Sequence, residues 1–566
     1  MKTFKLFSMA AVALMMAACS SEDIMTQQEP AKQGGLVHFT ATLAAPTDGV
    51  MRTAYTEVTS GTDAGTIKVA WEVGDEILVM NIVDPKKRGT VKVKTVNSDG
   101  SATIEGVSSD FGNNGETVGL AYPSELDIWK DKGITQDGTL SYIADNMDVR
   151  VGFGTLKVDG DKATLVDDVK MQSGIAIWKL TLQNNDATPA ALSASQVSIK
   201  VGDQIEASTT TLTTATSTVY LALQPFDGKD ITINAITADG YHTYSKTGVT
   251  LEAGKYYQST VQLAQTHEIN IADLCNDYTA QNGDILSGKL SNNVSISIAD
   301  GATVTLDGVN INGDGGWNKG DYAGLTPLGD ATIILKDGSE NIVKGFNENY
   351  PGIFAADDKK LTIQGTGKLE ASSNGSGAGI GGRYNTRCGD IEIQGGTITA
   401  TGGTGGAGIG AGDGTYPYNS SCNNITITGG TIKATGGDGA AGIGSGGSCS
   451  SCGDITISGG TIEATGGNGA AGIGSGRNSS YVYCCDITIT DGVTSVTATK
   501  GDGAPNSIGA GDGASCGTVT IGTQQMYNGT AWSPSPMVAG SYGGLNLAIT
   551  TTTNTDDTWT LTPVTP

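Results

Sequence analysis

The stretch that decides the fold is residues 452–476, which read Cys452-Gly-Asp-Ile-Thr-Ile-Ser-Gly-Gly-Thr-Ile-Glu-Ala-Thr-Gly-Gly-Asn-Gly-Ala-Ala-Gly-Ile-Gly-Ser-Gly476. The same unit recurs through residues 377–522. Its Ile-x-Ile segment begins at Ile391, Ile425, Ile455, Ile487 and Val519, at intervals of 34, 30, 32 and 32 residues. Weaker copies begin at Val304, Ile333 and Leu361. A fixed period of this length is typical of a solenoid.

The pattern inside one copy indicates which solenoid this is. Ile455 and Ile457 flank Thr456, and such alternation is typical of a strand with one solvent-facing side. Glycine pairs separate the strands and supply the backbone angles of tight corners. The sequence therefore predicts an all-β chain with a parallel β-helix of about eight coils over residues 268–522, spaced about 4.8 Å apart. A cap is expected over residues 523–566.

Equivalent residues of successive coils should stack into columns. Three inward apolar columns are expected, containing Ile391, Ile398 and Ile380. A cysteine precedes the first column by three residues in five copies: Cys388, Cys422, Cys452, Cys484 and Cys516. In-register Cβ atoms would lie slightly too far apart for a bond, so we expect buried, mostly reduced thiols. Bridges to Cys449 or Cys485 remain open.

The charge balance restricts the partners of this chain. Among 566 residues, 58 are acidic and 33 are basic, which gives a formal net charge of −25. Nucleic-acid binding needs a basic surface, so this balance argues against that partner. It suits a soluble surface or secreted protein.

Residues 1–19 have the pattern of a signal peptide. A basic start precedes a short apolar run that ends at Cys19. The run resembles a bacterial lipoprotein signal, in which the cysteine is acylated, although Met16 departs mildly from that pattern. Residues 20–23 resemble the acidic signal that sends Bacteroidetes lipoproteins to the outer face of the outer membrane. The resemblance implies a lipid anchor at Cys19 and a tether over residues 20–35; a plain secreted precursor is the alternative.

Residues 36–265 differ in composition and pattern from the repeat region. Glycine is of ordinary frequency there, and short alternating runs recur, for example at residues 37–43, 77–80 and 257–263. Short strands between turn signals predict two β-sandwiches.

Several motifs of this region resemble the fimbrillin-like family of Bacteroidetes. They include Phe39-Thr-Ala41, Trp71-Glu-Val-Gly-Asp-Glu-Ile77 and Leu251-Glu-Ala-Gly-Lys-Tyr-Tyr257. The resemblance implies tandem transthyretin-like sandwiches that build or anchor fimbriae. In shaft subunits of that family a protease cuts after an arginine, and a partner's strand fills the groove that opens. Arg52 holds a comparable place, although a surface arginine on a strand edge fits equally well.

Catalytic chemistry finds little support in the predicted coils. His38, His242 and His267 lie outside the coils proper, so histidine chemistry built from the coils is excluded. Asp357-Asp358 would point to opposite faces of a strand, whereas an acid–base pair needs two carboxylates that face one substrate. We expect a solvated turn there and a protein that is not an enzyme.

A metal site or cofactor is not expected either. Residues 402–410 imitate the calcium-binding nonapeptide of β-rolls, but Ala407 stands where that motif has its aspartate. An isolated calcium ion near Asp413 or Asp512 is a weaker alternative.

The loops just before the cysteines vary in sequence and carry the candidate binding residues. Because they leave each coil at one point of the repeat, they should emerge along one edge, where repeat proteins commonly bind ligands. Tyrosine rings suit the CH faces of sugars, and arginine and asparagine add hydrogen bonds. The candidates are Arg383, Tyr384, Tyr416, Tyr418, Asn419, Tyr481 and Tyr483. Equally, the tyrosines could simply cover a glycine-rich core.

These features predict a non-enzymatic surface adhesin that displays a ligand-binding β-helix. About 300 residues follow the fimbrillin-like region, and this resembles a fimbrial tip or accessory subunit that meets other subunits by strand addition. The β-helix also resembles carbohydrate-binding β-helical domains of gut bacteria, which implies a glycan or host-surface ligand. A polysaccharide-binding lipoprotein independent of fimbriae is the main alternative, and an enzyme acting on acidic glycans is the least favoured.

Overall fold

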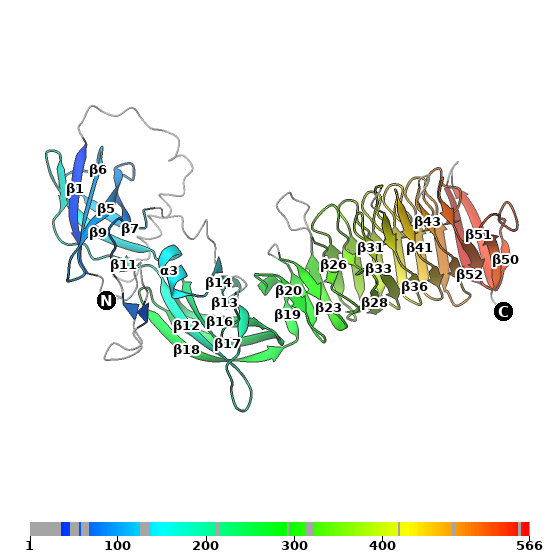
Figure 1. Cartoon of the computed structure of the whole chain (residues 1–566), viewed down its shortest axis with the longest axis horizontal. Helices are drawn as coiled ribbons and strands as arrows, with labels where there is room; N and C mark the ends of the chain where they lie inside the picture. Colours follow the sequence, from blue (N-terminus) through cyan, green and yellow to red (C-terminus); the bar gives the residue numbers. More distant parts are fainter. Residues whose placement is uncertain are drawn as a thin grey trace. The chain divides into compact units, whose positions relative to one another are not determined.

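The computed structural model describes residues 36–45, 56–57, 67–68, 70–124, 135–209, 212, 214–290, 294–312, 322–416, 419–477, 482–552 and 556–564. The chain divides between Thr266 and His267 into two compact units, which are described separately (Figure 1). The predicted sites at Cys19, Arg52, Tyr418 and Tyr481 lie outside the described residues.

The first sheet of the N-terminal unit closes on itself. It contains β1 (Val37–Leu43), β4 (Glu76–Asn81), β5 (Arg88–Val96), β6 (Ala102–Ser108), β7 (Thr117–Tyr122), β9 (Arg150–Asp159), β10 (Lys162–Leu165) and β11 (Gln172–Ser173). Their order is β10-β1-β6-β5-β4-β7-β9-β11, and because β9 also pairs with β10, all but β11 form a ring. Alternating residues such as Phe39, Ile77 and Leu120 form its core.

The second sheet contains one strand, β8, that lies in the chain between two strands of the first sheet. Its order is β15-β12-β18-β17-β16-β13-β14-β8. The strands are β8 (Thr135–Gln136), β12 (Ala176–Asn184), β13 (Ala194–Val201), β14 (Gln204–Thr209), β15 (Thr218–Leu223), β16 (Phe226–Thr237), β17 (Gly240–Leu251) and β18 (Tyr256–Thr266). Since β8 precedes β9–β11 in the chain, the two sheets interleave. A separate pair, β2 (Thr56–Glu57) and β3 (Ile67–Lys68), completes the unit.

A buried ion pair lies where the chain returns from the second sheet to the first. Helix α3 (Leu140–Asn146) follows β8 and is capped by Thr139, whose Oγ1 accepts the N–H of Tyr142 at 3.1 Å. Four residues after the helix, Arg150 starts β9, and its Nε lies 3.3 Å from Asp148 Oδ2. Both side chains are fully buried, so each charge needs the other.

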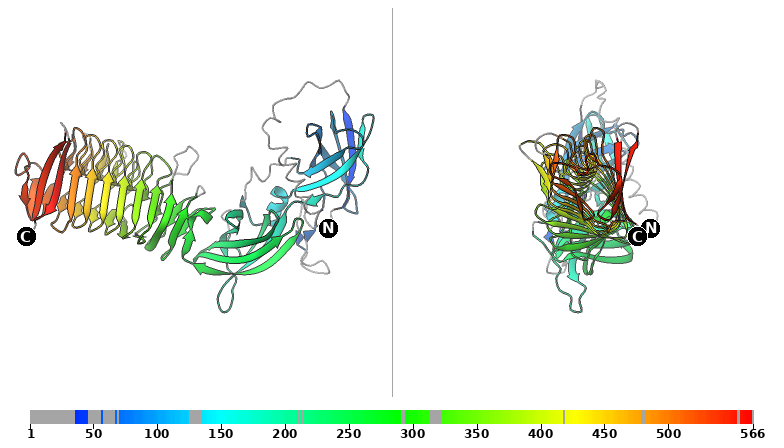
Figure 2. Two further views of the ribbon diagram at one scale, coloured as in Figure 1. Left: turned by 180° about the vertical axis from the view of Figure 1, so that it is seen from behind. Right: turned by 90° about the vertical axis from the view of Figure 1, so that its right-hand side faces the viewer.

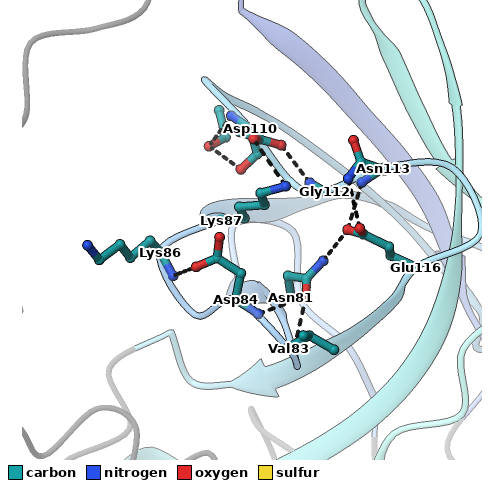
Figure 3. A network of polar contacts seen from close by, with 10 residues as sticks. Asn81, Val83, Asp84, Lys86, Lys87, Asp110, Gly112, Asn113 and Glu116 are labelled. Atoms are coloured by element: carbon teal, nitrogen blue, oxygen red, sulfur yellow. Dashed lines mark hydrogen bonds and ion pairs between the residues drawn. The ribbon is translucent and has the colours of Figure 1, made fainter.

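The loop between β4 and β5 is held by a polar network (Figure 3). Asn81 Oδ1 accepts the N–H groups of Val83 and Asp84 at 2.9 and 3.1 Å. Its Nδ2 donates to Glu116 Oε2 at 2.6 Å, and hydrogen bonds from Asn113 lower the pKa of that carboxyl. The network fixes the loop and leaves Val83 exposed.

The C-terminal unit is a parallel β-helix whose coils stack one behind another (Figure 2). A long sheet supplies up to two strands per coil: β19 (Glu268–Asn270), β21 (Ile285–Lys289), β23 (Ala302–Ile311), β25 (Ala331–Leu335), β26 (Glu340–Lys344), β28 (Lys360–Gly365), β29 (Lys368–Ser372), β32 (Asp390–Ile393), β33 (Thr397–Thr401), β36 (Ile425–Ile427), β37 (Thr431–Thr435), β40 (Ile455–Ile457), β41 (Thr461–Thr465), β44 (Ile487–Ile489), β45 (Ser495–Thr499) and β48 (Thr518–Ile521). A 3₁₀ turn, η2 (Ile271–Asp273), follows β19.

Shorter strands form the remaining sides of the coils. The first coils contribute β20 (Tyr278–Ala280), β22 (Ile296–Ile298) and β24 (Thr326–Pro327). The next sheet contains β27 (Ile353–Phe354), β30 (Ile380–Gly381), β34 (Ile409–Gly410), β38 (Ile443–Gly444), β42 (Ile473–Gly474) and β46 (Ile508–Gly509). The cysteine sheet contains β31 (Arg387–Cys388), β35 (Ser420–Cys422), β39 (Ser450–Cys452), β43 (Tyr483–Cys484) and β47 (Ser515–Cys516).

The predicted columns are confirmed by the strand register. Ile391 pairs with Ile425, and the column continues in register to Val519. The columns that contain Ile398 and Ile380 are also in register and buried. Together with the two N-terminal sheets, they confirm the expected all-β architecture.

The prediction of a mostly reduced cysteine column is wrong for its first two members. All five cysteines stack in register, but Cys388 and Cys422 form a disulfide. Their Cα atoms are 4.5 Å apart, which lies inside the range that disulfides accept, so stacked coils need little adjustment. Cys449 and Cys485 are free thiols, so neither open bridge is present.

Glycines at one corner allow the coils to stack closely. Gly410 and Gly444 have φ of +135° and +139°, which L side chains rarely adopt. A Cβ at Gly444 would also clash with the backbone carbonyl of Gly474 in the next coil. Both reasons require glycine in this column.

Antiparallel strands cover the C-terminal end of the long sheet. They are β49 (Gln524–Asn528), β50 (Gly540–Tyr542), β51 (Leu545–Thr552) and β52 (Asp556–Pro563). β52 pairs with β45, and Trp532 packs between Tyr527 and Trp559 with ring centroids 5.0 and 5.4 Å away. The aromatic rings therefore cover apolar surface that has no further coil to meet.

Candidate functional site

The variable loops emerge along one edge of the β-helix. In the five coils that contain β30, β34, β38, β42 and β46, the chain leaves that strand and enters the cysteine sheet through a loop. Both sheets run through successive coils in register, so these loops stack beside one another. We call this surface the loop edge; its described residues are 382–386, 411–416, 419, 445–449, 475–477, 482 and 510–514, and we include the adjoining Tyr483 at the start of β43.

A hollow of about 300 Å³ lies at the start of the loop edge. Its lining residues come from two neighbouring coils: Asn349, Tyr350, Arg383, Tyr384, Asn385 and Thr386. The volume is at the lower end of the range for small-molecule pockets, and its lining is mostly polar. Such a hollow fits a hydroxylated ligand better than an apolar one.

Arg383 lies over the ring of Tyr350 in this hollow. The guanidinium carbon is 5.3 Å from the ring centroid, within the range of a cation–π contact. Nη1 also donates to the Tyr350 hydroxyl at 3.1 Å. Two neighbouring coils thus fix the arginine, which has five N–H donors in total.

Tyr384 and Asn385 connect this hollow to the next loop. The Tyr384 hydroxyl donates to Thr415 Oγ1 at 3.3 Å, and Thr415 N–H donates to Asn385 Oδ1 at 2.7 Å. Asn385 has φ of +56°, a left-handed conformation that asparagine tolerates. These contacts hold two loops of adjacent coils in a fixed arrangement.

The other predicted tyrosines are spread along the edge. Tyr416 is 74% exposed, and Asn419 near it is also exposed. Tyr483 is 49% exposed and lies on β43, in register with Ser451 and Ser515 of the neighbouring coils. The structure therefore brings Arg383 and Tyr384 into one hollow, whereas Tyr416 and Tyr483 lie on later coils.

Asp413 and Asp512, the candidates for an isolated calcium ion, differ in burial. Asp413 Oδ1 accepts the N–H of Ser448 at 2.9 Å, and its carboxylate packs against Gly405. Burial raises the pKa of the Asp413 carboxyl, against backbone hydrogen bonds that lower it. Asp512 is exposed. No group of three His, Cys, Asp or Glu side chains among the described residues could hold a metal ion.

His267 lies directly before β19, outside the strands of the coils. This residue opens the β-helix unit, and its Nδ1 lies 2.9 Å from Asp284 Oδ1. Asp284 is buried and also accepts hydrogen bonds from the Tyr278 hydroxyl at 2.6 Å and from the Gln281 N–H at 2.8 Å. Asp357 and Asp358 are exposed in a turn, as expected.

Sequence reasoning missed the part of the hollow that comes from the preceding coil. Asn349 and Tyr350 come from the loop that precedes Ile353. The predicted candidates come only from the loops that follow Ile380 and its equivalents in later coils. The register of Ile353 with Ile380 was the available signal, because it places the segment before Ile353 one coil away from Arg383.

Comparison with known protein families identifies the repeat of the C-terminal unit. A family model described as a β-helix repeat matches residues 391–413, 425–447 and 455–477. No curated protein matches the chain. Among the described residues, helices long and apolar enough to cross a membrane are absent.

Several solved structures are similar to part of the chain. A candidate cell adhesion protein of Bacteroides ovatus is 15% identical, with 41% of this chain and 94% of that chain covered and a TM-score of 0.25. A fimbrial assembly protein of Parabacteroides distasonis is 14% identical, with 40% and 90% covered and a TM-score of 0.22. A fimbrial protein of B. ovatus is 12% identical, with 42% and 50% covered and a TM-score of 0.21. This chain is thus similar to adhesion and fimbrial proteins of Bacteroides and Parabacteroides and carries a β-helix repeat in its C-terminal unit.

Proposed function

We propose that this chain is a non-enzymatic cell-surface adhesin that binds a glycan along the loop edge. One observation carries the proposal: the hollow around Arg383, together with exposed tyrosines on later coils of the same edge. A surface of stacked coils with aromatic rings and fixed hydrogen-bond donors suits an extended ligand with repeated hydroxyl groups.

The contacts within the hollow suggest what the first sugar would meet. Arg383 is held over Tyr350, so little rotamer freedom remains for it to lose on binding. Asn349 and Asn385 add donors and acceptors to the lining. A sugar with a carboxylate would gain most from the guanidinium, because charge-assisted hydrogen bonds are the stronger ones.

A glycan array with the full chain tests this proposal. We expect binding that weakens about tenfold, or 1.4 kcal/mol, when Tyr416→Ala removes an exposed ring. Arg383→Gln should weaken acidic glycans more than neutral ones. If both variants bind every glycan as the unaltered chain does, the ligand site lies elsewhere.

In its fimbrial form the proposal includes a lipid anchor at Cys19, an outer-membrane location and strand addition by fimbrial subunits. The placement of β1 supports the last point, because β1 pairs with both β6 and β10. A cut after Arg52 would separate β1 from the rest, and its loss would leave two strand edges unpaired. Cross-linked fimbriae should contain this chain, and Arg52→Ala should keep it out of them.

The alternative is a polysaccharide-binding surface lipoprotein that never enters a fimbria. The loop edge supports this alternative equally, because it does not depend on β1. Cross-linked fimbriae that lack this chain, together with intact glycan binding, would favour it.

A further inference from the structure

The cysteine column continues beyond the bond between Cys388 and Cys422. Cys452 and Cys484 are its next two members, and they pair in register between β39 and β43. Their Sγ atoms are 3.6 Å apart. Both side chains are buried, at 2% and 1% exposure, so contact between them is enforced by the stacking of the coils.

We propose that Cys452 and Cys484 form a second disulfide between coils when the protein folds under oxidising conditions. The second pair holds the same register positions as the first. Cys388 and Cys422 occupy the same register positions two coils earlier, and they are bonded with Cα atoms 4.5 Å apart. Because the coils repeat, the same bond needs only a small movement of two sulfur atoms at the second pair.

The fifth cysteine is the odd member of the column. A Cβ built on Gly509 would lie 3.6 Å from Cys516 Sγ and 3.3 Å from the ring of Trp532, so this thiol faces Gly509 and the aromatic cluster of the cap. Once Cys484 is bonded to Cys452, Cys516 has no partner left in the column. It then stays a thiol, and the column consists of two cross-links followed by one unpaired sulfur.

Bond formation needs an oxidant, and a thiol–disulfide oxidoreductase is the class that fits an exported chain. One thiol loses its proton to water, and the resulting thiolate attacks one sulfur of the oxidoreductase's disulfide. That S–S bond breaks, a mixed disulfide forms, and the second cysteine of the oxidoreductase leaves as a thiolate. The other thiolate then attacks the sulfur of that first cysteine and expels the thiolate of the oxidoreductase. The chain loses two protons and two electrons, and the oxidoreductase is reduced by two electrons.

Burial decides when this exchange occurs. A mixed disulfide with another protein cannot form at sulfur atoms that are 1–2% exposed, so the exchange must precede closure of these coils. Once closed, both bonds should resist reduction in the native state. Two pairs of adjacent coils are then tied together and cannot separate there.

Peptide mapping of the unreduced full chain tests the proposal. The chain is denatured with an alkylating reagent present and then cut with trypsin, which cleaves after Lys433, Arg477 and Lys500. Cys452 then lies in residues 434–477, Cys484 in residues 478–500 and Cys516 in residues 501–566. We expect peptide 434–477 to be joined to peptide 478–500, and Cys516 to be alkylated.

Three variants assign the bond, because each of the joined peptides contains a second cysteine. Cys484→Ser should abolish the joined species, whereas Cys485→Ser and Cys449→Ser should keep it. Three results would overturn the proposal: complete alkylation of Cys452 and Cys484 in the unreduced chain, a bond between peptides 478–500 and 501–566, or a bond that survives Cys484→Ser. Mapping of the unaltered chain alone distinguishes the expected bond from the first two of these results. That part of the test therefore does not depend on the folding of any variant.

Discussion

The two units of this chain build their cores in opposite ways. In the first sheet, large aromatic residues from distant segments meet, such as Phe39 and Phe111 with ring centroids 5.0 Å apart. In the β-helix, an isoleucine meets the equivalent isoleucine of the next coil, as Ile425 meets Ile455. A unique set of long-range contacts specifies the first core, and one short repeated pattern specifies the second. We therefore expect the effect of a substitution on stability to depend on the individual site in the N-terminal unit. In the β-helix it should depend on the position within the repeat.

The largest effect is expected in the N-terminal unit, at the buried ion pair. Arg150→Ala leaves the buried Asp148 carboxylate without this partner, and we expect a loss of about 3–5 kcal/mol in the free energy of unfolding. Urea unfolding followed separately for each unit checks this. Lys92→Ala, which breaks an exposed ion pair with Glu76, is the control and should change stability by less than about 1 kcal/mol. Equal effects of the two variants would remove the distinction between buried and exposed pairs.

A smaller effect is expected at the glycine corner of the β-helix. Gly444→Ala combines an unfavourable φ with a clash against the next coil, so we expect a loss of about 3 kcal/mol. Gly503→Ala is the matched control, because Gly503 also has positive φ but nothing lies within 4 Å of its Cβ position. It should cost only about 1–2 kcal/mol. Thermal unfolding of both variants would show whether stacking, rather than φ alone, requires the glycine.

The disulfide between Cys388 and Cys422 should stabilise only the unit that contains it. It closes a separation of 34 residues, and Cys422→Ser should cost about 2–4 kcal/mol in the β-helix with no change in the sandwiches. Cys275→Ser is the control and should leave both transitions nearly unchanged. A shift of the sandwich transition in Cys422→Ser would mean that the two units do not unfold independently.

The smallest effect concerns pH and Asp413. Burial raises the pKa of this carboxyl, so the folded state favours its protonated form. The corresponding stability is present below the ordinary value of 3.8 and is lost as pH rises through the raised value. Asp413→Asn should therefore gain stability relative to the unaltered chain as pH rises from 3 to 7. Asp512→Asn, at an exposed position, is the matched control.

The same contrast explains how much could be read from the sequence. The β-helix columns were predictable because every copy repeats the pattern of Ile455 and Ile457, and the register follows from the period. The interleaving of the two N-terminal sheets was not, because β8 pairs with β14, about 70 residues later, without a local signal.

The candidate site was predictable only in part, because its residues come from loops that are separated along the chain. The loop residues Arg383 and Tyr416 follow from their place in the repeat, but Tyr350 joins the hollow from the preceding coil and from a different loop. The disulfide was missed because a general coil spacing of about 4.8 Å leaves its formation undecided. The actual Cα separation of 4.5 Å is a detail of packing.

The measurement that tests the loop edge most directly is the dissociation constant of the best glycan from the array, for two double variants of the full chain. Tyr416→Ala with Tyr483→Ala removes two exposed rings from the loop edge, and Lys433→Ala with Glu463→Ala removes an exposed ion pair from the outer face of the long sheet. We predict at least tenfold weaker binding for the tyrosine variant and unchanged binding for the ion-pair variant. Unchanged binding by the tyrosine variant, or a loss confined to the ion-pair variant, would contradict a ligand site on the loop edge.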